Sequence, residues 1–110
     1  MHLPNPLRAH VPIAKLVDYC LNPDHPRGRH KARVFAATLG ISAADAEQLR
    51  NALLAAAAAG DAVATESDAY GQRFVLDFQM DGPAGQAVVR SLWIVRTGED
   101  FASLTSCYVL

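Results

Sequence analysis

The fold is decided by the stretch at residues 70–96, which reads YGQRFVLDFQMDGPAGQAVVRSLWIVR. In its first part large apolar side chains alternate with more polar ones, and the apolar positions are Phe74, Leu76 and Phe78. A repeat of two residues is that of a β-strand with one buried face. The glycine- and proline-containing loop at residues 81–85 then turns the chain back. Residues 87–96 are apolar on both faces, which predicts a central strand.

Two further strands are predicted on either side of this hairpin. Residues 62–66 form the first strand, which a short turn connects to the strand at 70–80. A second turn, at residues 97–100, leads into the last strand at 101–109. Strands that follow each other through such short turns lie side by side and antiparallel. The sequence therefore predicts a four-stranded antiparallel sheet over its C-terminal half.

The N-terminal half follows the repeat of helices instead. After a lead-in at residues 1–10, expected to be irregular, Pro12 suits the first position of a helix. The residues that follow form one apolar stripe at helical spacing: Ile13, Leu16, Val17, Cys20 and Leu21. This helix ends at Asn22-Pro23, because a residue that precedes proline is pushed out of the α region.

Two more helices are predicted before the sheet. The second runs over residues 29–39 and ends at Gly40, which supplies its C-terminal cap. Its packing residues are expected to be Val34, Phe35, Thr38 and Leu39. The third starts at Ser42, which forms a capping-box variant with Asp45, and continues to Gly60.

The chain is therefore expected to be one α+β domain over residues 1–110. About three N-terminal helices, within residues 11–60, pack on one face of a four-stranded antiparallel sheet, within residues 61–110. The chain is 51% hydrophobic and 19% charged, which is a globular composition with enough apolar material for a core.

Neither an export signal nor a membrane span is expected, because the longest apolar run, at residues 53–59, is too short. Cys20 and Cys107 do not form a ligand-spaced pair. We expect core thiols of a cytoplasmic protein, and a bridge between them remains open. The chain has no P-loop, dinucleotide fingerprint or HExxH motif, so no cofactor is expected.

The distribution of charge is more informative than its sum, which is −1. Four of the ten Lys and Arg residues fall within seven positions, alongside His25 and His30: Arg27, Arg29, Lys31 and Arg33. Positive side chains at the start of a helix oppose its dipole. Cations and free backbone N–H groups would together bind phosphate, so this basic segment predicts an anion site.

Two alternatives stay open for the basic segment. The first is a solvated basic turn, either without a partner or paired with Glu99 or Asp100. The second is a metal site of Cys20, His25 and His30, which recur at intervals of five. No two of these three stand at the usual ligand spacing, so no metal is expected.

A resemblance covers nearly the whole chain. Residues 15–35, KLVDYCLNPDHPRGRHKARVF, resemble an uncharacterised family of small bacterial proteins with the pattern K-L-x-x-Y-L-L-N-P-x-H-P-x-G-x-x-K-A-x-x-F. The sheet half matches through Tyr70-Gly71-Gln72-Arg73, Arg90-Ser91-x-Trp93-Ile94, Arg96-Thr97-Gly98 and Leu104-Thr105-x-Cys107-Tyr108. The layout is similar to the barnase, EndoU, colicin and RelE superfamily of metal-independent ribonucleases. The resemblance thus implies an endoribonuclease, the toxin of a bacterial toxin–antitoxin pair.

Metal-free RNA cleavage requires an acid/base pair and cations around the phosphate. The catalytic candidates are His30, Lys31, His25, Arg96, Thr105 and Tyr108. Among them His30 is the preferred acid/base, because an imidazole titrates near neutral pH. Further phosphate or RNA contacts are expected from Arg27, Arg29, Arg33, Arg73 and Arg90. Arg90 lies in an apolar strand and requires an anionic partner, which is either Asp77 or a ligand.

Two rival functions remain. One is a non-catalytic protein-binding module, an antitoxin or an adaptor, and the other is a nucleotide-binding domain. The second face of the central strand is also apolar, which indicates that another molecule covers this face of the sheet. A small antitoxin-like protein or a second copy of the chain would do so, and RNA and such a protein are the expected partners.

Overall fold

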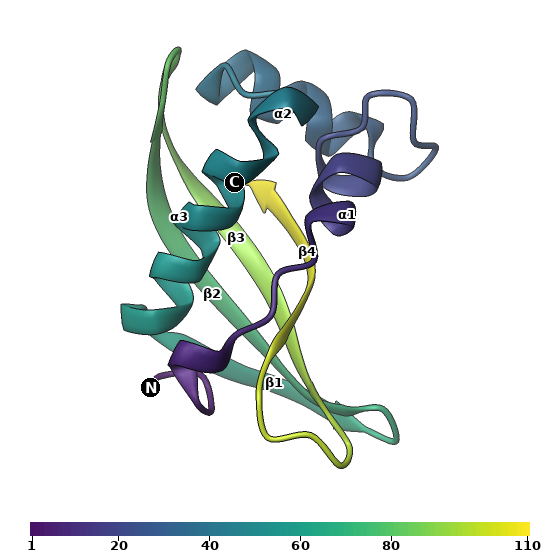
Figure 1. Cartoon of the computed structure of the whole chain (residues 1–110), viewed down its shortest axis with the longest axis vertical. Helices are drawn as coiled ribbons and strands as arrows, with labels where there is room; N and C mark the ends of the chain where they lie inside the picture. Colours follow the sequence, from purple (N-terminus) through teal and green to yellow (C-terminus); the bar gives the residue numbers. More distant parts are fainter.

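The computed structural model describes all 110 residues. Its helical segments are η1 (Pro6–Arg8), α1 (Ile13–Lys15), η2 (Leu16–Cys20), α2 (Arg29–Leu39), η3 (Ala43–Asp45) and α3 (Ala46–Ala59). Its strands are β1 (Ala62–Asp68), β2 (Gly71–Gly82), β3 (Gly85–Arg96) and β4 (Ser103–Val109). Three α-helices precede a four-stranded antiparallel sheet, which confirms the predicted α+β class (Figure 1). No helix is long and apolar enough to cross a membrane.

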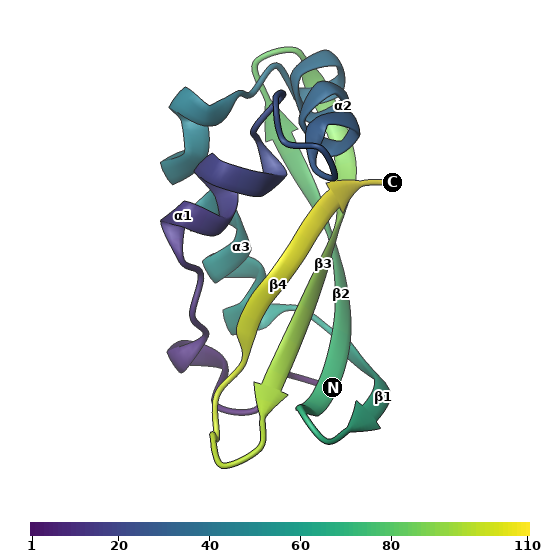
Figure 2. The same cartoon turned by 90° about the vertical axis from the view of Figure 1, so that its right-hand side faces the viewer.

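The sheet is a meander in the order β1-β2-β3-β4, with every neighbouring pair antiparallel. The β2–β3 hairpin pairs without interruption from Gly71 opposite Arg96 to Gly82 opposite Gly85. β3 lies between β2 and β4, as its apolar pattern predicts. α1 and α3 lie on one face of the sheet, and α2 crosses the end at which β4 finishes (Figure 2).

The core fills the space between α3, α2 and the inner face of the sheet. Its largest fully buried side chains include Trp93, Phe35, Leu49, Leu53 and Leu76. The Trp93 indole N–H donates to the Ser91 hydroxyl at 2.8 Å, and that hydroxyl donates to the Leu76 carbonyl at 2.6 Å. The polar groups of the inner face are thus satisfied inside the core, as buried polar groups must be.

The opposite face of the sheet carries apolar side chains that remain in contact with solvent. Val63 is 61% exposed and Val88 is 43% exposed. Val63 pairs with Val75, and Val88 pairs with Gln79, so the alternation of the strands places them on the face away from Leu76.

The first helix differs from its prediction. α1 is a single turn, and η2 continues it as a π-helix, in which the Leu21 N–H donates to the Leu16 carbonyl at 2.8 Å. A π turn holds more residues than an α turn, so positions that share a face of an α-helix lose their alignment. Ile13 and Val17 are each 38% exposed for this reason, whereas Leu16, Cys20 and Leu21 are buried.

The lead-in is more ordered than predicted. Besides the 3₁₀ turn η1, it contains a short parallel bridge to β4. The His10 N–H donates to the Ala102 carbonyl at 2.8 Å, and the Leu104 N–H donates to the His10 carbonyl at 2.9 Å. Leu3, within this segment, and Val11, directly after it, are buried. The N-terminal segment therefore packs along the edge strand.

The two longer helices agree with their predictions. α2 has the predicted bounds and ends at Gly40, whose φ of 72° lies in the left-handed region that favours glycine. Ser42 and Asp45 form the predicted capping box before α3. One packing residue was assigned wrongly, because Val34 is 41% exposed on the outer side of α2.

Gly28, directly before α2, allows the helix to start against the backbone of η2. A Cβ atom at this position would lie 2.3 Å from the Tyr19 carbonyl oxygen. The backbone angles of Gly28, φ −94° and ψ −14°, do not require glycine. The close approach alone therefore excludes a side chain.

We predict that Gly28→Ala lowers the free energy of unfolding by about 3 kcal/mol, because backbone atoms must move apart. Gly98→Ala is the control: Gly98 has a φ of 88° and no neighbour within 4 Å, so only its backbone conformation costs stability, about 1 kcal/mol. Urea unfolding measures both values. Equal losses for the two variants would show that the contact of Gly28 with Tyr19 does not hold these segments together.

Candidate functional site

Lys31, in the first turn of α2, joins three elements of the fold. Its ammonium group donates to the Tyr19 hydroxyl of η2 at 2.7 Å and to the Ser106 hydroxyl of β4 at 3.1 Å. The same nitrogen lies 4.8 Å from the ring centre of Tyr19 and 5.7 Å from that of Tyr108, which is within cation–π range. We call these four residues, Tyr19, Lys31, Ser106 and Tyr108, the Lys31 cluster.

No carboxylate neutralises Lys31. The five ion pairs of the chain all involve other groups. An ammonium group has three N–H donors, and the two hydroxyls use two of them. Lys31 is thus a half-buried cation with one donor left for a ligand. Because a buried charge is stabilised by an opposite charge, the cluster favours an anion.

Tyr19 reaches Lys31 because of two local features. It lies in the π-helix η2, a rare conformation that frequently occurs at functional sites. The loop that follows brings α2 back against η2 at Gly28. Tyr19 and Lys31 are twelve residues apart, and neither is close in sequence to Ser106 and Tyr108.

His25 shapes the loop between η2 and α2. Its Nδ1 accepts the backbone N–H groups of Arg27 and Gly28, both at 3.0 Å. A backbone N–H can only donate, so Nδ1 is the acceptor and the ring hydrogen is on Nε2. The ring packs edge-on against Tyr19 with the centroids 4.8 Å apart. His25 is therefore a loop cap that has one N–H to offer to a ligand.

Two open hollows flank the contact between Lys31 and Tyr19. The larger, about 540 Å³, is lined by Pro12, Ala14, Lys15, Asp18, Tyr19, His25 and Arg27. The smaller, about 230 Å³, is lined by His30, Lys31, Val34, Tyr108 and Val109. Three of the six predicted catalytic residues, His30, Lys31 and Tyr108, thus share one hollow, and His25 lies in the next.

The remaining cations of the basic segment are exposed and have no carboxylate partner. They are Arg27, Arg29 and Arg33. The alternative that Glu99 or Asp100 pairs with this segment is wrong, because those acids pair elsewhere. Asp100 lies 3.1 Å from Arg8, and Glu99 lies 3.9 Å from Arg96. The segment keeps its positive charge.

The arginines of the sheet have internal partners instead. Arg90 forms two hydrogen bonds of 2.8 Å to the carboxylate of Asp77, the partner opposite it in the ladder. These hydrogen bonds lower the pKa of Asp77 and raise the pKa of Arg90. Of the two partners considered for Arg90, Asp77 is thus the one that compensates its charge.

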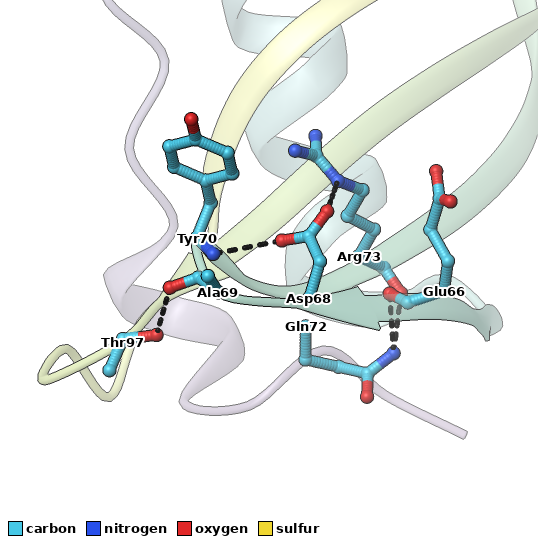
Figure 3. A network of polar contacts seen from close by, with 7 residues as sticks. All are labelled: Glu66, Asp68, Ala69, Tyr70, Gln72, Arg73 and Thr97. Atoms are coloured by element: carbon cyan, nitrogen blue, oxygen red, sulfur yellow. Dashed lines mark hydrogen bonds and ion pairs between the residues drawn. The ribbon is translucent and has the colours of Figure 1, made fainter.

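Arg73, near the start of β2, also has a carboxylate partner (Figure 3). Its Nε donates to Asp68 at 3.5 Å, and Asp68 also accepts the Tyr70 N–H at 2.9 Å. Hydrogen bonding from the Tyr70 backbone, and then the charge of Arg73, lower the pKa of Asp68. Arg73 and Arg90 are therefore engaged and do not join the basic segment.

Two predicted catalytic residues lie away from the Lys31 cluster. Arg96 is six positions along β3 from Arg90, the residue opposite Tyr108, which is a distance of roughly 20 Å. Thr105 is left without a partner where the register of β3 and β4 shifts. Its hydroxyl donates to the Leu92 carbonyl at 3.1 Å, so it does not orient a ligand beside Lys31.

Two buried thiols lie beside the cluster. Hydrogen bonding from Cys107 is the main cause that lowers the pKa of Cys20 to about 7, with the positive charge of Lys31 contributing and burial opposing. The same hydrogen bond and burial raise the pKa of Cys107. The chain contains no group of three or more His, Cys, Asp or Glu side chains arranged to hold a metal ion.

Sequence reasoning missed Tyr19 and Ser106. Tyr19 stands in the same motif as His25 and Lys31, which was a usable signal. The sequence around Ser106 carried no such signal, because the position of Ser106 beside Lys31 depends on the irregular register of β4.

Comparison with known proteins places the chain in one family. No curated protein and no solved structure matches it. A family model described as a domain of unknown function, DUF6883, matches residues 2–110. The match includes the basic segment, the Lys31 cluster and all four strands. The chain therefore belongs to the DUF6883 family.

Proposed function

We propose that this chain is a metal-independent endoribonuclease whose Lys31 cluster binds the scissile phosphate. The observation that supports this most strongly is the half-buried Lys31 ammonium, which two hydroxyls hold without any carboxylate. Phosphodiesters carry one negative charge and unhindered acceptor oxygens, which suit such a group. The exposed Arg27, Arg29 and Arg33 would hold the neighbouring phosphates of a single strand.

The proposed reaction is attack of a ribose 2′-hydroxyl on the adjacent phosphorus. The 2′-oxygen forms a bond to phosphorus, and the bond to the 5′-oxygen breaks, which leaves a 2′,3′-cyclic phosphate. His30, exposed beside Lys31, takes the proton of the 2′-hydroxyl, and the leaving oxygen takes a proton from solvent. Lys31 and the Tyr19 and Tyr108 hydroxyls stabilise the negative charge that develops on the phosphoryl oxygens.

His25 takes a different part in this proposal from His30. Protonation of its Nδ1 would break the two hydrogen bonds that shape the loop. Its Nε2–H instead donates to the substrate and positions it. This assignment modifies the expectation that His25 is the second acid/base.

We predict that Lys31→Ala lowers the cleavage rate of a fluorogenic RNA oligonucleotide about 100-fold, because a charge-stabilising donor is lost. His30→Ala is expected to lower it by about 100-fold or more. Tyr19→Phe, which removes only a hydroxyl, tests the same cluster with little risk to folding. Arg96→Ala is the matched control, because it removes a cation outside the cluster and should leave the rate unchanged.

The assay is run in EDTA, with thermal unfolding confirming that each variant is folded. The proposal is contradicted if the wild-type protein does not cleave the oligonucleotide. It is also contradicted if Arg96→Ala loses as much of the cleavage rate as the variants of the cluster.

Binding should depend on salt in proportion to the phosphates contacted. For three or four contacts to a non-cleavable 2′-deoxy oligonucleotide, we predict that log K falls with log [KCl] with a slope of about −2 to −3. Arg29→Ala should make the slope shallower by about 0.7. Arg73→Ala, whose side chain is bound to Asp68, should leave the slope unchanged. Fluorescence anisotropy measures the slope for each variant. A slope that changes in Arg73→Ala and stays the same in Arg29→Ala would place the RNA on the sheet.

The second part of the proposal is that the chain is the toxin of a toxin–antitoxin pair. The exposed Val63 and Val88 on the outer face of the sheet support a small protein partner. The same face equally supports the rival function, a protein-binding module without catalysis.

Inducible expression in bacteria separates these two functions. We predict growth arrest and RNA degradation with the wild-type chain, and normal growth with His30→Ala at equal protein level. Normal growth with both, together with intact RNA, would favour the binding module.

A further inference from the structure

The larger hollow beside the Lys31 cluster contains charged side chains that are not paired within the chain. Lys15, at the end of α1, and Asp18, in η2, line it together with Arg27. None of the three takes part in the five ion pairs of the chain. The Asp18 carboxylate and the two cations are thus more than 4.0 Å apart. Opposite charges line this hollow without closing it.

Two aromatic rings line the same hollow. Tyr19 and His25 pack edge-on, with their centroids 4.8 Å apart and an angle of 73° between the rings. Rings of this kind bind nucleobases by stacking. The volume of about 540 Å³ is within the range of small-molecule sites, roughly 300–1,000 Å³. The hollow can therefore accept a planar ligand that carries both donors and acceptors.

Tyr19 belongs both to this hollow and to the Lys31 cluster. Its hydroxyl accepts the Lys31 ammonium at 2.7 Å, and that nitrogen lies 4.8 Å from the ring centre. A phosphate on Lys31 and a base in the hollow would thus lie next to the same tyrosine. Only one sugar separates the base and the phosphate of a nucleotide, so a single nucleotide can reach both places.

The polar groups of the hollow distinguish the four bases of RNA. A carboxylate only accepts hydrogen bonds, and guanine alone presents two adjacent donors, N1–H and the 2-amino group, on one edge. Adenine and cytosine have an acceptor beside their amino group, and uracil has one donor between two acceptors. Each of these would turn an acceptor toward Asp18. The other edge of guanine carries O6 and N7, the acceptors to which Arg and Lys donate.

We propose that this hollow is a base site that selects guanine in the nucleotide whose phosphate Lys31 binds, an inference that rests on the proposed function. Asp18 accepts N1–H and the 2-amino group, and Lys15 or Arg27 donates to O6 and N7. The base lies against Tyr19. Asp18 would repel a second phosphate in this hollow, so the hollow favours a neutral base.

The test uses non-cleavable 2′-deoxy oligoadenylates that differ only at one central base, with affinities measured by fluorescence anisotropy at constant salt. We predict that the wild-type protein binds the oligonucleotide with central guanine about tenfold more tightly than the one with adenine. Inosine lacks only the 2-amino group of guanine, so it should bind at least threefold more weakly than guanine. Equal affinities for guanine and adenine would overturn the proposal.

Asp18→Asn tests the carboxylate itself, and it should abolish the preference for guanine. Asp24→Asn is the matched control, because Asp24 is also an exposed carboxylate without an ion pair but does not line the hollow. This control should keep the tenfold preference. A preference that survives in Asp18→Asn, or that is lost equally in Asp24→Asn, would overturn the proposal. Thermal unfolding shows that each variant is folded.

The outcomes separate the base site from the proposed function. Equal binding of all the oligonucleotides would overturn the guanine site and leave RNA binding intact. If no oligonucleotide binds, the proposed function fails, and NMR titration with guanosine and adenosine monophosphates decides whether the base site exists. Shifts of the Tyr19 and His25 signals with the guanosine nucleotide alone would support the base site. No shift with either nucleotide would overturn it as well.

Discussion

A single half-buried ammonium group connects the parts of this fold that carry its chemistry. Lys31 lies in the first turn of α2, Tyr19 belongs to η2 and Ser106 belongs to β4, and the two hydrogen bonds of Lys31 hold these three elements together. Removing a charge from water is unfavourable unless its donors are satisfied. Two neutral hydroxyls satisfy the hydrogen-bonding requirement of Lys31 but leave its charge uncompensated. This imbalance is the reason why we propose that the cluster binds an anion.

The neighbouring features depend on the same arrangement. The π-helix η2 places Tyr19 toward Lys31 and Cys20 toward the interior. Gly28 lets α2 begin against the Tyr19 backbone, and His25 fixes the loop between them. The exposed arginines then add positive charge around the cluster. The molecule has a net charge of −1, so the affinity for a polyanion that we propose would have to come from this local concentration of unpaired cations.

Most of the fold could be predicted from local patterns in the sequence. The alternation of Phe74, Leu76 and Phe78, and the two apolar faces of β3, indicate the hairpin and its central position. Gly40 and the capping box at Ser42 mark helix boundaries through backbone chemistry that is local to them. The first helix was less predictable, because the hydrogen bonds of a π turn do not appear in the spacing of apolar residues. Its stripe included Ile13 and Val17, which are exposed.

The candidate site was only half predictable, because it depends on which distant residues meet. The basic segment stood out as a concentration of charge, and His30, Lys31 and Tyr108 indeed share one hollow. Arg96 and Thr105 lie outside this hollow. Arg96 is six positions along β3 from the residue opposite Tyr108, and Thr105 lies where the register of β3 and β4 shifts, so its side chain does not face Lys31. Whether an arginine is paired also depends on tertiary structure. Asp77 lies opposite Arg90 in the sheet, and this neutralises a residue that sequence alone left open.

The central claim is that Lys31 receives an anion, and the chain is well suited to a direct measurement of it. Lys31 and Lys15 are its only lysines, so the lysine side-chain ammonium groups give two signals in a ¹H–¹⁵N NMR spectrum. During titration with a non-cleavable RNA oligonucleotide, the Lys31 signal should shift and saturate with the same Kd as the binding isotherm. An oligonucleotide that binds while the Lys31 signal stays unchanged would contradict the claim.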